Sequence, residues 1–524
     1  MLRRQMIGIS MAATGLALAA TGLALAAPAA RALSGSTLHA LVQPEPSGLM
    51  IGLYLNSPTQ LIAGNVYESL LRFDERLTPL PSLARAWEVS TDGRRYTFHL
   101  QPGVSWHDGK PFTAADAVFS VDVFLRSTHA RLRANLAVVE SIRALDPMTV
   151  EFRLIHPFGA FLNLFEVGTM PMVPRHLYEG SDFRTNPANM APIGTGPYRF
   201  ARWERGAYIQ LVRNPRYYRP DQPHIDTLYF HVIPDAAARA VAFETGRIDV
   251  VPGGAVEYFD VARLGRLPGA QVTTRGWEFF SPLSWLWVNH RRAPLDRIAF
   301  RQALSYAIDR EAIARIAWQG FAQPATGPFN SHVRYFTRDV AQYPHDPARA
   351  RALVAASGYR GETLRLLPLP YGESWTRMAE MVRQNLLQAG VKVAVTPTDV
   401  AGWSARLGQW DYDLAFTYVH QFGDPAIGIA HHYTSDTIAQ GSPFNNVEGY
   451  RNPKVDALFA AGARETDDGR RRAIYVQVQK LLADEVPNIW LHELNFPTLY
   501  RSRVNNVVSS GIGLNDSLGR AWLA

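Results

Sequence analysis

The sequence contains no cysteine, and this absence excludes several kinds of chemistry. Disulfide bonds, thiolate metal sites and cysteine nucleophiles all need a sulfhydryl group. An N-terminal lipid attached to cysteine is excluded for the same reason, so we expect a released protein rather than a lipoprotein. Long apolar runs are also scarce, and the one run that approaches the thickness of a bilayer is Ile7 to Ala27.

This apolar run has the features of an export signal. Arg3 and Arg4 form a positive segment ahead of it, and Ala-Arg-Ala at 30–32 fits a small-x-small cleavage site. We expect residues 1–32 to be a signal peptide that directs export to the periplasm, by the general or the twin-arginine route. An uncleaved membrane anchor is the alternative, because the run is long for a signal peptide.

Motifs of catalysis and of nucleic-acid binding are missing as well. The sequence has no Gly-x-Ser-x-Gly elbow and no Walker loop, and His492-Glu493 lacks the second histidine of a zinc-protease helix. The formal net charge is +7, and the basic run at 470–472 (Arg-Arg-Arg) is interpreted as the solvated face of a helix. We therefore expect no enzymatic activity, no catalytic residues and no nucleic-acid partner.

The composition is that of a globular protein with a large core. Hydrophobic residues make up 47% of the 524 positions and charged residues 19%. A chain of this length exceeds one ordinary domain, so two or three lobes are expected. The 12 Trp, 21 Tyr and 25 Phe could line a wide ligand site, or they could fill large cores.

A strand and a helix start are predicted close together in the first third of the chain. Tyr96, Phe98 and Leu100 alternate with polar residues, which is the pattern of a half-buried strand. Thr113 precedes Asp116 by three positions and an apolar run follows, which indicates a capping box at a helix start.

From Trp285 onwards the predicted strands and helices alternate, which favours an α/β lobe with helices on both sides of a sheet. Asp346-Pro347 is a good helix start, because Asp caps the first turn and Pro suits its first position. The predicted helices of this region cover residues 300–316, 347–358, 378–389 and 468–485.

Several motifs, in order along the chain, resemble the peptide/nickel-binding family (family 5) of extracytoplasmic solute-binding proteins. Any one of them is a weak signal, but together they run from about residue 65 to 495. Trp106 stands where this family usually has Phe. The motifs are GVSWHDGKPFTAADAV at 103–118, GTGPY at 194–198, RNP at 213–215, RQALSYAIDR at 301–310 and YRNPKVD at 450–456.

The resemblance implies an α/β, periplasmic-binding-protein-like fold with two lobes and an extra subdomain, of class II and the large cluster C type. Lobe I is expected to be discontinuous, with the extra subdomain inserted into it. The expected segments are 33–74, 191–284 and 490–524 for lobe I, 75–190 for the extra subdomain and 285–489 for lobe II.

The resemblance also implies a function. Proteins of this family capture a small organic solute, such as a peptide or peptide-like compound, by hinge closure and deliver it to the permease subunits of an ABC importer in the inner membrane. We expect a monomer with no metal and no cofactor. The alternative is a nickel-chelate or haem-type receptor of the same fold, and a more distant one is a secreted peptide or amide hydrolase. The sequence does not distinguish a receptor for transport from one that senses the ligand.

The ligand site is predicted in the segment from Trp403 to Tyr433, where strand 413–418 leads into the loop 420–425. In peptide-binding members of the family, an aspartate three positions before the Asp-Pro pair holds the α-ammonium of the peptide, and Gln421 occupies that position here. An amide cannot supply a countercharge, so a zwitterionic peptide is disfavoured. Gln421→Asp is predicted to improve the binding of a peptide with a free N-terminus.

The remaining site candidates follow from the same comparison, and each has a structural alternative. The aromatic side chains could pack in a core, Asp424-Pro425 could fix the turn of the loop, and His431-His432 favour a place on a loop or rim over a metal site. The predicted ligand-binding residues are Trp285, Trp403, Tyr418, Gln421, Phe422 and Asp424.

Overall fold

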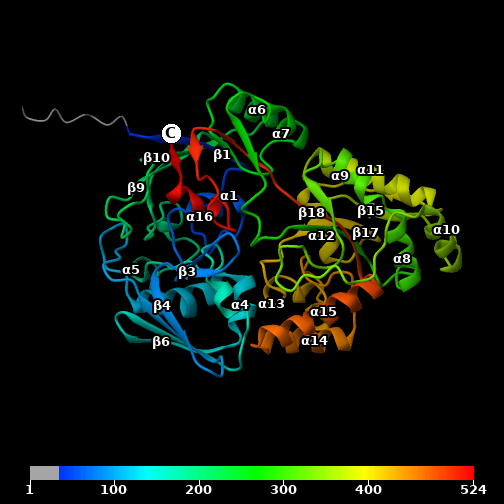
Figure 1. Cartoon of the computed structure of the whole chain (residues 1–524), viewed down its shortest axis with the longest axis horizontal. Helices are drawn as coiled ribbons and strands as arrows, with labels where there is room; N and C mark the ends of the chain where they lie inside the picture. Colours follow the sequence, from blue (N-terminus) through cyan, green and yellow to red (C-terminus); the bar gives the residue numbers. More distant parts are fainter. Residues whose placement is uncertain (1–34) are drawn as a thin grey trace, which may run out of the picture. The chain divides into compact units, whose positions relative to one another are not determined.

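Three large β-sheets organise the protein, as a computed structural model that describes residues 35–524 shows (Figure 1). Residues from Ser36 onwards form one compact unit. No helix within this described part is long and apolar enough to cross a membrane. The predicted signal peptide, residues 1–32, lies outside the described residues.

The first sheet has seven strands in the order β12-β19-β11-β1-β10-β9-β8, and we call this part of the molecule lobe I. Its central strand β1 runs parallel to β10 and β11. Buried and half-buried residues alternate along β10, as a strand with one face in a core requires. The elements are β1 (Thr37–Val42), α1 (Ser57–Ala63), β8 (Tyr198–Glu204), β9 (Tyr208–Arg213), β10 (Thr227–Val232), α6 (Ala236–Glu244), β11 (Val250–Val251), α7 (Tyr258–Leu264), β12 (Ala270–Thr273), β19 (Thr498–Arg501) and α16 (Leu514–Ser517).

The second sheet has four antiparallel strands in the order β4-β5-β7-β6 and forms the extra subdomain. The predicted alternation is confirmed, since Tyr96, Phe98 and Leu100 on β5 are buried. The predicted helix start is confirmed too, because the Thr113 backbone N–H donates to Asp116 Oδ2 at 2.9 Å. The elements are β4 (Ala84–Val89), β5 (Arg95–Leu100), α2 (Ala114–Val118), the π-helical η1 (Phe119–Leu125), α3 (Arg126–Thr128), α4 (Ala130–Leu136), β6 (Val139–Asp146), β7 (Thr149–Leu154) and α5 (Arg175–Tyr178).

The third sheet has six strands in the order β14-β18-β13-β17-β15-β16, and we call this part lobe II. Strand β15 is parallel to β16 and β17, whereas β13 is antiparallel to β17 and β18. Figure 1 shows α8 to α11 around the strands β15 and β17. The elements are β13 (Leu283–Val288), α8 (Ile298–Ala307), α9 (Arg310–Ile316), β14 (Ala322–Pro324), α10 (Pro347–Ala356), β15 (Leu364–Leu367), α11 (Glu373–Gln388), β16 (Val393–Val395), α12 (Val400–Gly408), β17 (Leu414–Val419), α13 (Pro425–Gly428), α14 (Pro453–Arg464), α15 (Asp468–Glu485) and β18 (Asn488–Leu494).

One predicted helix of lobe II is wrong. Residues 300–316 form two helices, α8 and α9, because Ile308 adopts an extended conformation and ends the first. Asp309 then caps the second by accepting a hydrogen bond from the Ala312 backbone N–H at 2.9 Å. The predicted cap of α10 is confirmed, since Asp346 accepts from the Arg349 N–H at 2.9 Å.

The chain passes between the sheets of lobe I and lobe II in two segments that we call the crossovers. Residues 274–282 connect β12 to β13, and residues 495–497 connect β18 to β19. The Trp277 indole N–H donates to the carbonyl oxygen of Phe496 at 2.8 Å, so a hydrogen bond ties the two crossovers together. Strand β18 continues to Leu494, past the residue at which lobe II was expected to end.

Lobe II also buries an acid next to its sheet. Glu448 has no exposed surface, and its Oε1 accepts a hydrogen bond from Asn488 Nδ2 at 2.8 Å. Its Oε2 is buried and has no hydrogen-bond partner within the described part of the chain. Burial raises the pKa of Glu448 to about 8, so the carboxyl group is held in its neutral form well above the usual range.

Glu448→Gln is expected to change how the stability of the protein depends on pH. A carboxyl whose pKa is raised by folding contributes stability below its unfolded pKa of 4.5, and this contribution is lost as the pH rises to about 8. The variant should therefore gain stability relative to the native chain between pH 4.5 and 8, as measured by urea unfolding at several pH values. The exposed Glu140→Gln is the control. If the free energy of unfolding of Glu448→Gln, relative to that of the native chain, stays flat or falls as the pH rises, the raised pKa of Glu448 is contradicted.

Candidate functional site

Aromatic rings gather where the end of β17 meets the two crossovers. The His420 ring lies at the centre, with ring-centroid distances of 5.2 Å to Phe280, 5.6 Å to Tyr418 and 5.9 Å to Phe422. The loop that carries this histidine is attached to the first crossover, since the Gln421 backbone N–H donates to the Phe280 carbonyl at 2.8 Å. We call the following residues the crossover cluster: Trp277, Phe280, Tyr418, His420, Phe422 and Phe496.

The cluster is apolar enough to change the ionisation of its members. Tyr418, His420 and Phe422 are half-buried. Burial, together with the nearby positive charge of Arg131, lowers the pKa of His420 to about 4, so the imidazole is neutral at pH 7. Burial likewise raises the pKa of Tyr418 to about 12. The cluster therefore offers flat ring faces and uncharged hydrogen-bonding groups, which suits the binding of an organic solute.

The extra subdomain contributes a cation to the same place. The guanidinium carbon of Arg131, on α4, lies 3.8 Å from the centre of the Phe422 ring. Its Nη2 donates to Thr169 Oγ1 at 3.0 Å, but its Nη1 is buried and has no hydrogen-bond partner. His420 Nε2 is buried without a partner as well. Within the described residues, two polar atoms at the contact between the extra subdomain and lobe II thus lack partners.

Gln421, the predicted counterpart of the ammonium-binding aspartate, is turned into lobe II. Its side chain is fully buried, its Oε1 accepts from the Asn330 N–H at 2.7 Å, and its Nε2 donates to the Pro328 carbonyl at 2.8 Å. Gln421→Asp would remove this donor and place a charge in a buried position. We therefore now expect this substitution to destabilise the loop, where the sequence predicted better peptide binding.

Asp424 fixes the same loop through a buried ion pair. Its two carboxylate oxygens accept from the two Nη atoms of Arg471, each at 2.7 Å, and it also caps α13 by accepting from the Ala426 N–H. Arg471 is 1% exposed, and its Nε donates to the Gly462 carbonyl at 2.8 Å. The interpretation of 470–472 as a solvated face is wrong for Arg471, because this side chain points inward to meet the carboxylate.

The structure places the predicted tryptophans in the core of lobe II. Trp285 has no exposed surface and its ring packs 5.0 Å from that of His432. Trp403 is 2% exposed and packs 6.2 Å from Trp287. Of the predicted ligand-binding residues, Tyr418 and Phe422 belong to the crossover cluster, whereas Gln421 and Asp424 hold the loop from within.

His420, His431 and His432 do not form a metal site within the described residues. The rings of His431 and His432 lie 4.0 Å apart, but no group of three or more His, Cys, Asp or Glu side chains in this part of the chain is arranged to hold a metal ion. A ligand that carried its own metal would have to bring most of its coordination shell with it.

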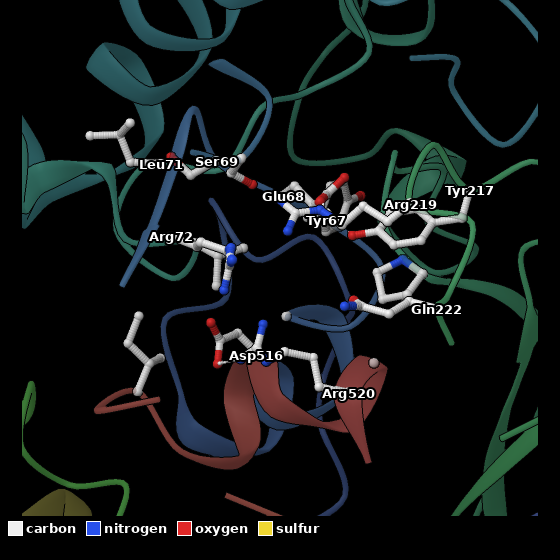
Figure 2. A pocket seen from close by; sticks show the side chains of 16 residues that line it. Tyr67, Glu68, Ser69, Leu71, Arg72, Tyr217, Arg219, Gln222, Asp516 and Arg520 are labelled. Carbon is white, nitrogen blue, oxygen red and sulfur yellow. Dashed lines mark hydrogen bonds and ion pairs between the residues drawn. The ribbon is translucent and has the colours of Figure 1, made fainter. Parts of the chain in front are cut away.

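Figure 2 shows a small pocket inside lobe I, at which three guanidinium groups, of Arg72, Arg219 and Arg520, meet the carboxyl groups of Glu68 and Asp516. Its volume is about 40 Å³, roughly the space of one water molecule. Glu68 already accepts hydrogen bonds from three hydroxyl groups at 2.9 Å, and Arg520 Nη2 lies 3.1 Å from Asp516 Oδ1. Both carboxyl groups thus have partners in the pocket wall, whereas Arg72 Nε donates to the Pro81 carbonyl at 3.2 Å.

A second hollow, of about 300 Å³, lies in lobe II beside Arg310. The guanidinium of Arg310 already donates to the carbonyl oxygens of Trp490 at 2.7 Å and of Ser305 at 3.0 Å. No member of the crossover cluster lines either of these two pockets. Neither of these two pockets therefore coincides with the aromatic rings at the crossovers.

Sequence reasoning did not single out Arg131, His420, Trp277 or Phe496. His420 had a usable signal, because it follows directly on a predicted strand of an α/β lobe. Arg131 had none, since it is one of many arginines on a helix and meets Phe422 only in the folded chain.

The ion pair between Asp424 and Arg471 generates a stability prediction. Asp424→Asn or Arg471→Met is expected to lower the free energy of unfolding by about 3–5 kcal/mol, because either change leaves the other group buried and unpaired. The matched control is Arg470→Met, whose side chain is exposed and pairs with Glu465; its effect should stay within about 1 kcal/mol. Urea unfolding of the three variants measures this, and equal effects at 470 and 471 would contradict it.

Comparison with known proteins identifies the family. Residues 78–440 match the model of the bacterial extracellular solute-binding proteins, family 5 middle. The glutathione-binding protein GsiB of Pectobacterium atrosepticum is 28% identical over 465 residues, which cover 83% of this chain and 84% of that relative. The di/tripeptide-binding protein 1 of Pseudomonas aeruginosa is 28% identical over 490 residues, covering 87% of this chain and 88% of its own.

A solved structure agrees with this match. The ABC transporter substrate-binding protein CtaP of Listeria monocytogenes has a TM-score of 0.83 and 28% identity, and the similarity covers 93% of this chain and 99% of that one. The likeness confirms the predicted α/β fold of the periplasmic-binding-protein type, and the family match confirms the resemblance seen in the motifs. The chain belongs to the bacterial extracellular solute-binding proteins of family 5.

Proposed function

We propose that residues 33–524 act as a periplasmic receptor that captures a small organic solute, peptide-like in size, and delivers it to the inner-membrane permease of an ABC importer. Residues 1–32 would direct export and then be removed. The names of the relatives support a ligand of this size, since they are described as glutathione-binding and di/tripeptide-binding proteins. The observation that carries the proposal is the crossover cluster, where aromatic rings and partnerless polar atoms meet next to the segments that join the lobes.

The crossovers supply the mechanism of capture. Lobe I and lobe II are joined by residues 274–282 and 495–497, so a change in their backbone angles would open and close the site. Arg131 of the extra subdomain and Phe422 of lobe II touch each other in this structure, and a bound solute would extend that contact. The ligand then stabilises the closed state by contacts that the open state cannot make.

The receptor is expected to act without bond chemistry. The polar groups of the crossover cluster are a neutral imidazole and the weakly acidic hydroxyl of Tyr418, and the buried carboxylate of the adjoining loop is occupied by Arg471. These groups can hold a solute by hydrogen bonds and stacking. None of them is arranged as a nucleophile with its general base.

A ligand screen with a turnover assay tests this function. The protein from residue 33 is mixed with di- to pentapeptides, modified amino acids, sugars and metal chelates, and the melting temperature is recorded; a ligand that binds the native state must raise it. We expect a shift with at least one small organic solute, recovery of that solute unchanged, and a monomer by light scattering. Release of products would show a hydrolase instead, and stoichiometric metal in the purified protein would show a metal receptor.

A further inference from the structure

Two arginine side chains converge on one carbonyl oxygen in the small pocket of Figure 2. We call it the lobe I pocket, and its charged residues are Glu68, Arg72, Arg219, Asp516 and Arg520. Arg72 lies on β2 (Leu71–Phe73), which forms a hairpin with β3 (Pro79–Pro81). Arg72 Nε donates to the Pro81 carbonyl oxygen at 3.2 Å, and Arg219 Nη2 donates to the same oxygen at 3.0 Å. Because a neutral carbonyl cannot balance two positive charges, the pair of guanidinium groups needs negative charge from elsewhere.

The acids of the lobe I pocket supply only part of that charge. Glu68 acts on the charge of Arg219. Asp516 acts on the charge of Arg72, but its Oδ1 lies 3.1 Å from Arg520 Nη2, so it is shared between two cations. Three guanidinium groups therefore face two carboxyl groups, and one positive charge is in excess even when both acids are ionised.

Arg72 is the cation that is least compensated. Within the described residues its side chain makes no ion pair, and its hydrogen bond to the Pro81 carbonyl uses Nε and leaves both Nη atoms without a partner. Burial and the like charges of Arg219 and Arg520 lower the pKa of Arg72 and outweigh the opposite effect of Asp516. An anion that accepts from the Nη atoms would stabilise the charged guanidinium.

The lobe I pocket also has a suitable size and a further donor. Its volume of about 40 Å³ is close to that of one water molecule, and a monatomic anion such as chloride is of similar size. Ser69 lines the pocket and is 1% exposed, and its Oγ is buried without a hydrogen-bond partner in the part of the chain that the structure describes. A buried hydroxyl without a partner is costly, and this one can rotate to donate to an anion. Phosphate and other polyatomic anions are larger than this space.

We propose that the lobe I pocket binds a small inorganic anion, chloride by size, between the guanidinium groups of Arg72 and Arg219. N–H groups of both arginines and the Ser69 hydroxyl donate to the anion, and its charge balances the excess. The charge of Arg520 opposes that of Arg72, so the anion also removes a repulsion between the C-terminal segment 512–520 and the β2–β3 hairpin. No member of the crossover cluster lines this pocket, and the site does not depend on the proposed receptor function.

Urea unfolding in matched salts tests the anion site. The protein from residue 33 is unfolded in increasing concentrations of sodium chloride, with sodium gluconate making up a constant ionic strength, because gluconate is too large for the pocket. An anion that binds only the folded state raises the ratio of folded to unfolded protein about elevenfold at a concentration ten times its dissociation constant. We expect this ratio to rise with chloride, and a protein that is equally stable in both salts would overturn the proposal.

Two variants and a diffraction experiment locate the effect. Arg72→Met removes the guanidinium and keeps an unbranched side chain, so it should abolish the chloride dependence. Arg76→Met changes an exposed arginine between β2 and β3 and should keep the dependence in full. An unchanged chloride dependence in Arg72→Met would overturn the site. Should that variant fail to fold, crystals of the native protein in sodium bromide decide: an anomalous peak between Arg72 and Arg219 is expected, and its absence would mean that the pocket holds water only.

Discussion

The bidentate contact between Asp424 and Arg471 holds the loop on which the proposed binding region is built. Both groups are removed from water, which is expensive for two charges unless every oxygen and N–H finds a partner. Here the carboxylate also receives the Ala426 N–H, and the guanidinium also reaches the Gly462 carbonyl. The pair therefore fastens the loop after β17 to helix α15, and His420 and Phe422 take their positions from it.

The proposed site is assembled from parts of the chain that are far apart in sequence. Trp277 belongs to the first crossover, Phe496 to the second, His420 to the loop of lobe II and Arg131 to the extra subdomain. Ring contacts and single hydrogen bonds link the parts to one another. A binding site of this construction can be altered at one wall while the others keep their packing, which explains how one fold serves receptors for different solutes.

Sequence reasoning succeeded where the signal is local. The alternation at Tyr96 to Leu100 and the caps at Thr113 and Asp346 depend on neighbours within one turn or one strand, and the structure has them as predicted. It failed at Arg471, because a run of three arginines gives no indication that the middle one meets an acid 47 positions earlier. The ring faces and partnerless atoms of the crossover cluster likewise exist only after the lobes have folded.

The two crossovers differ in length, and the hydrogen bond between Trp277 and Phe496 joins them at one point. The short segment 495–497 has few backbone dihedral angles, so sliding or twisting of one lobe against the other would strain it. Rotation about an axis through the joined segments would strain it least. A receptor that closes by such a rotation would lose less conformational entropy when it encloses a solute, and it would bind the solute more tightly for the same contacts.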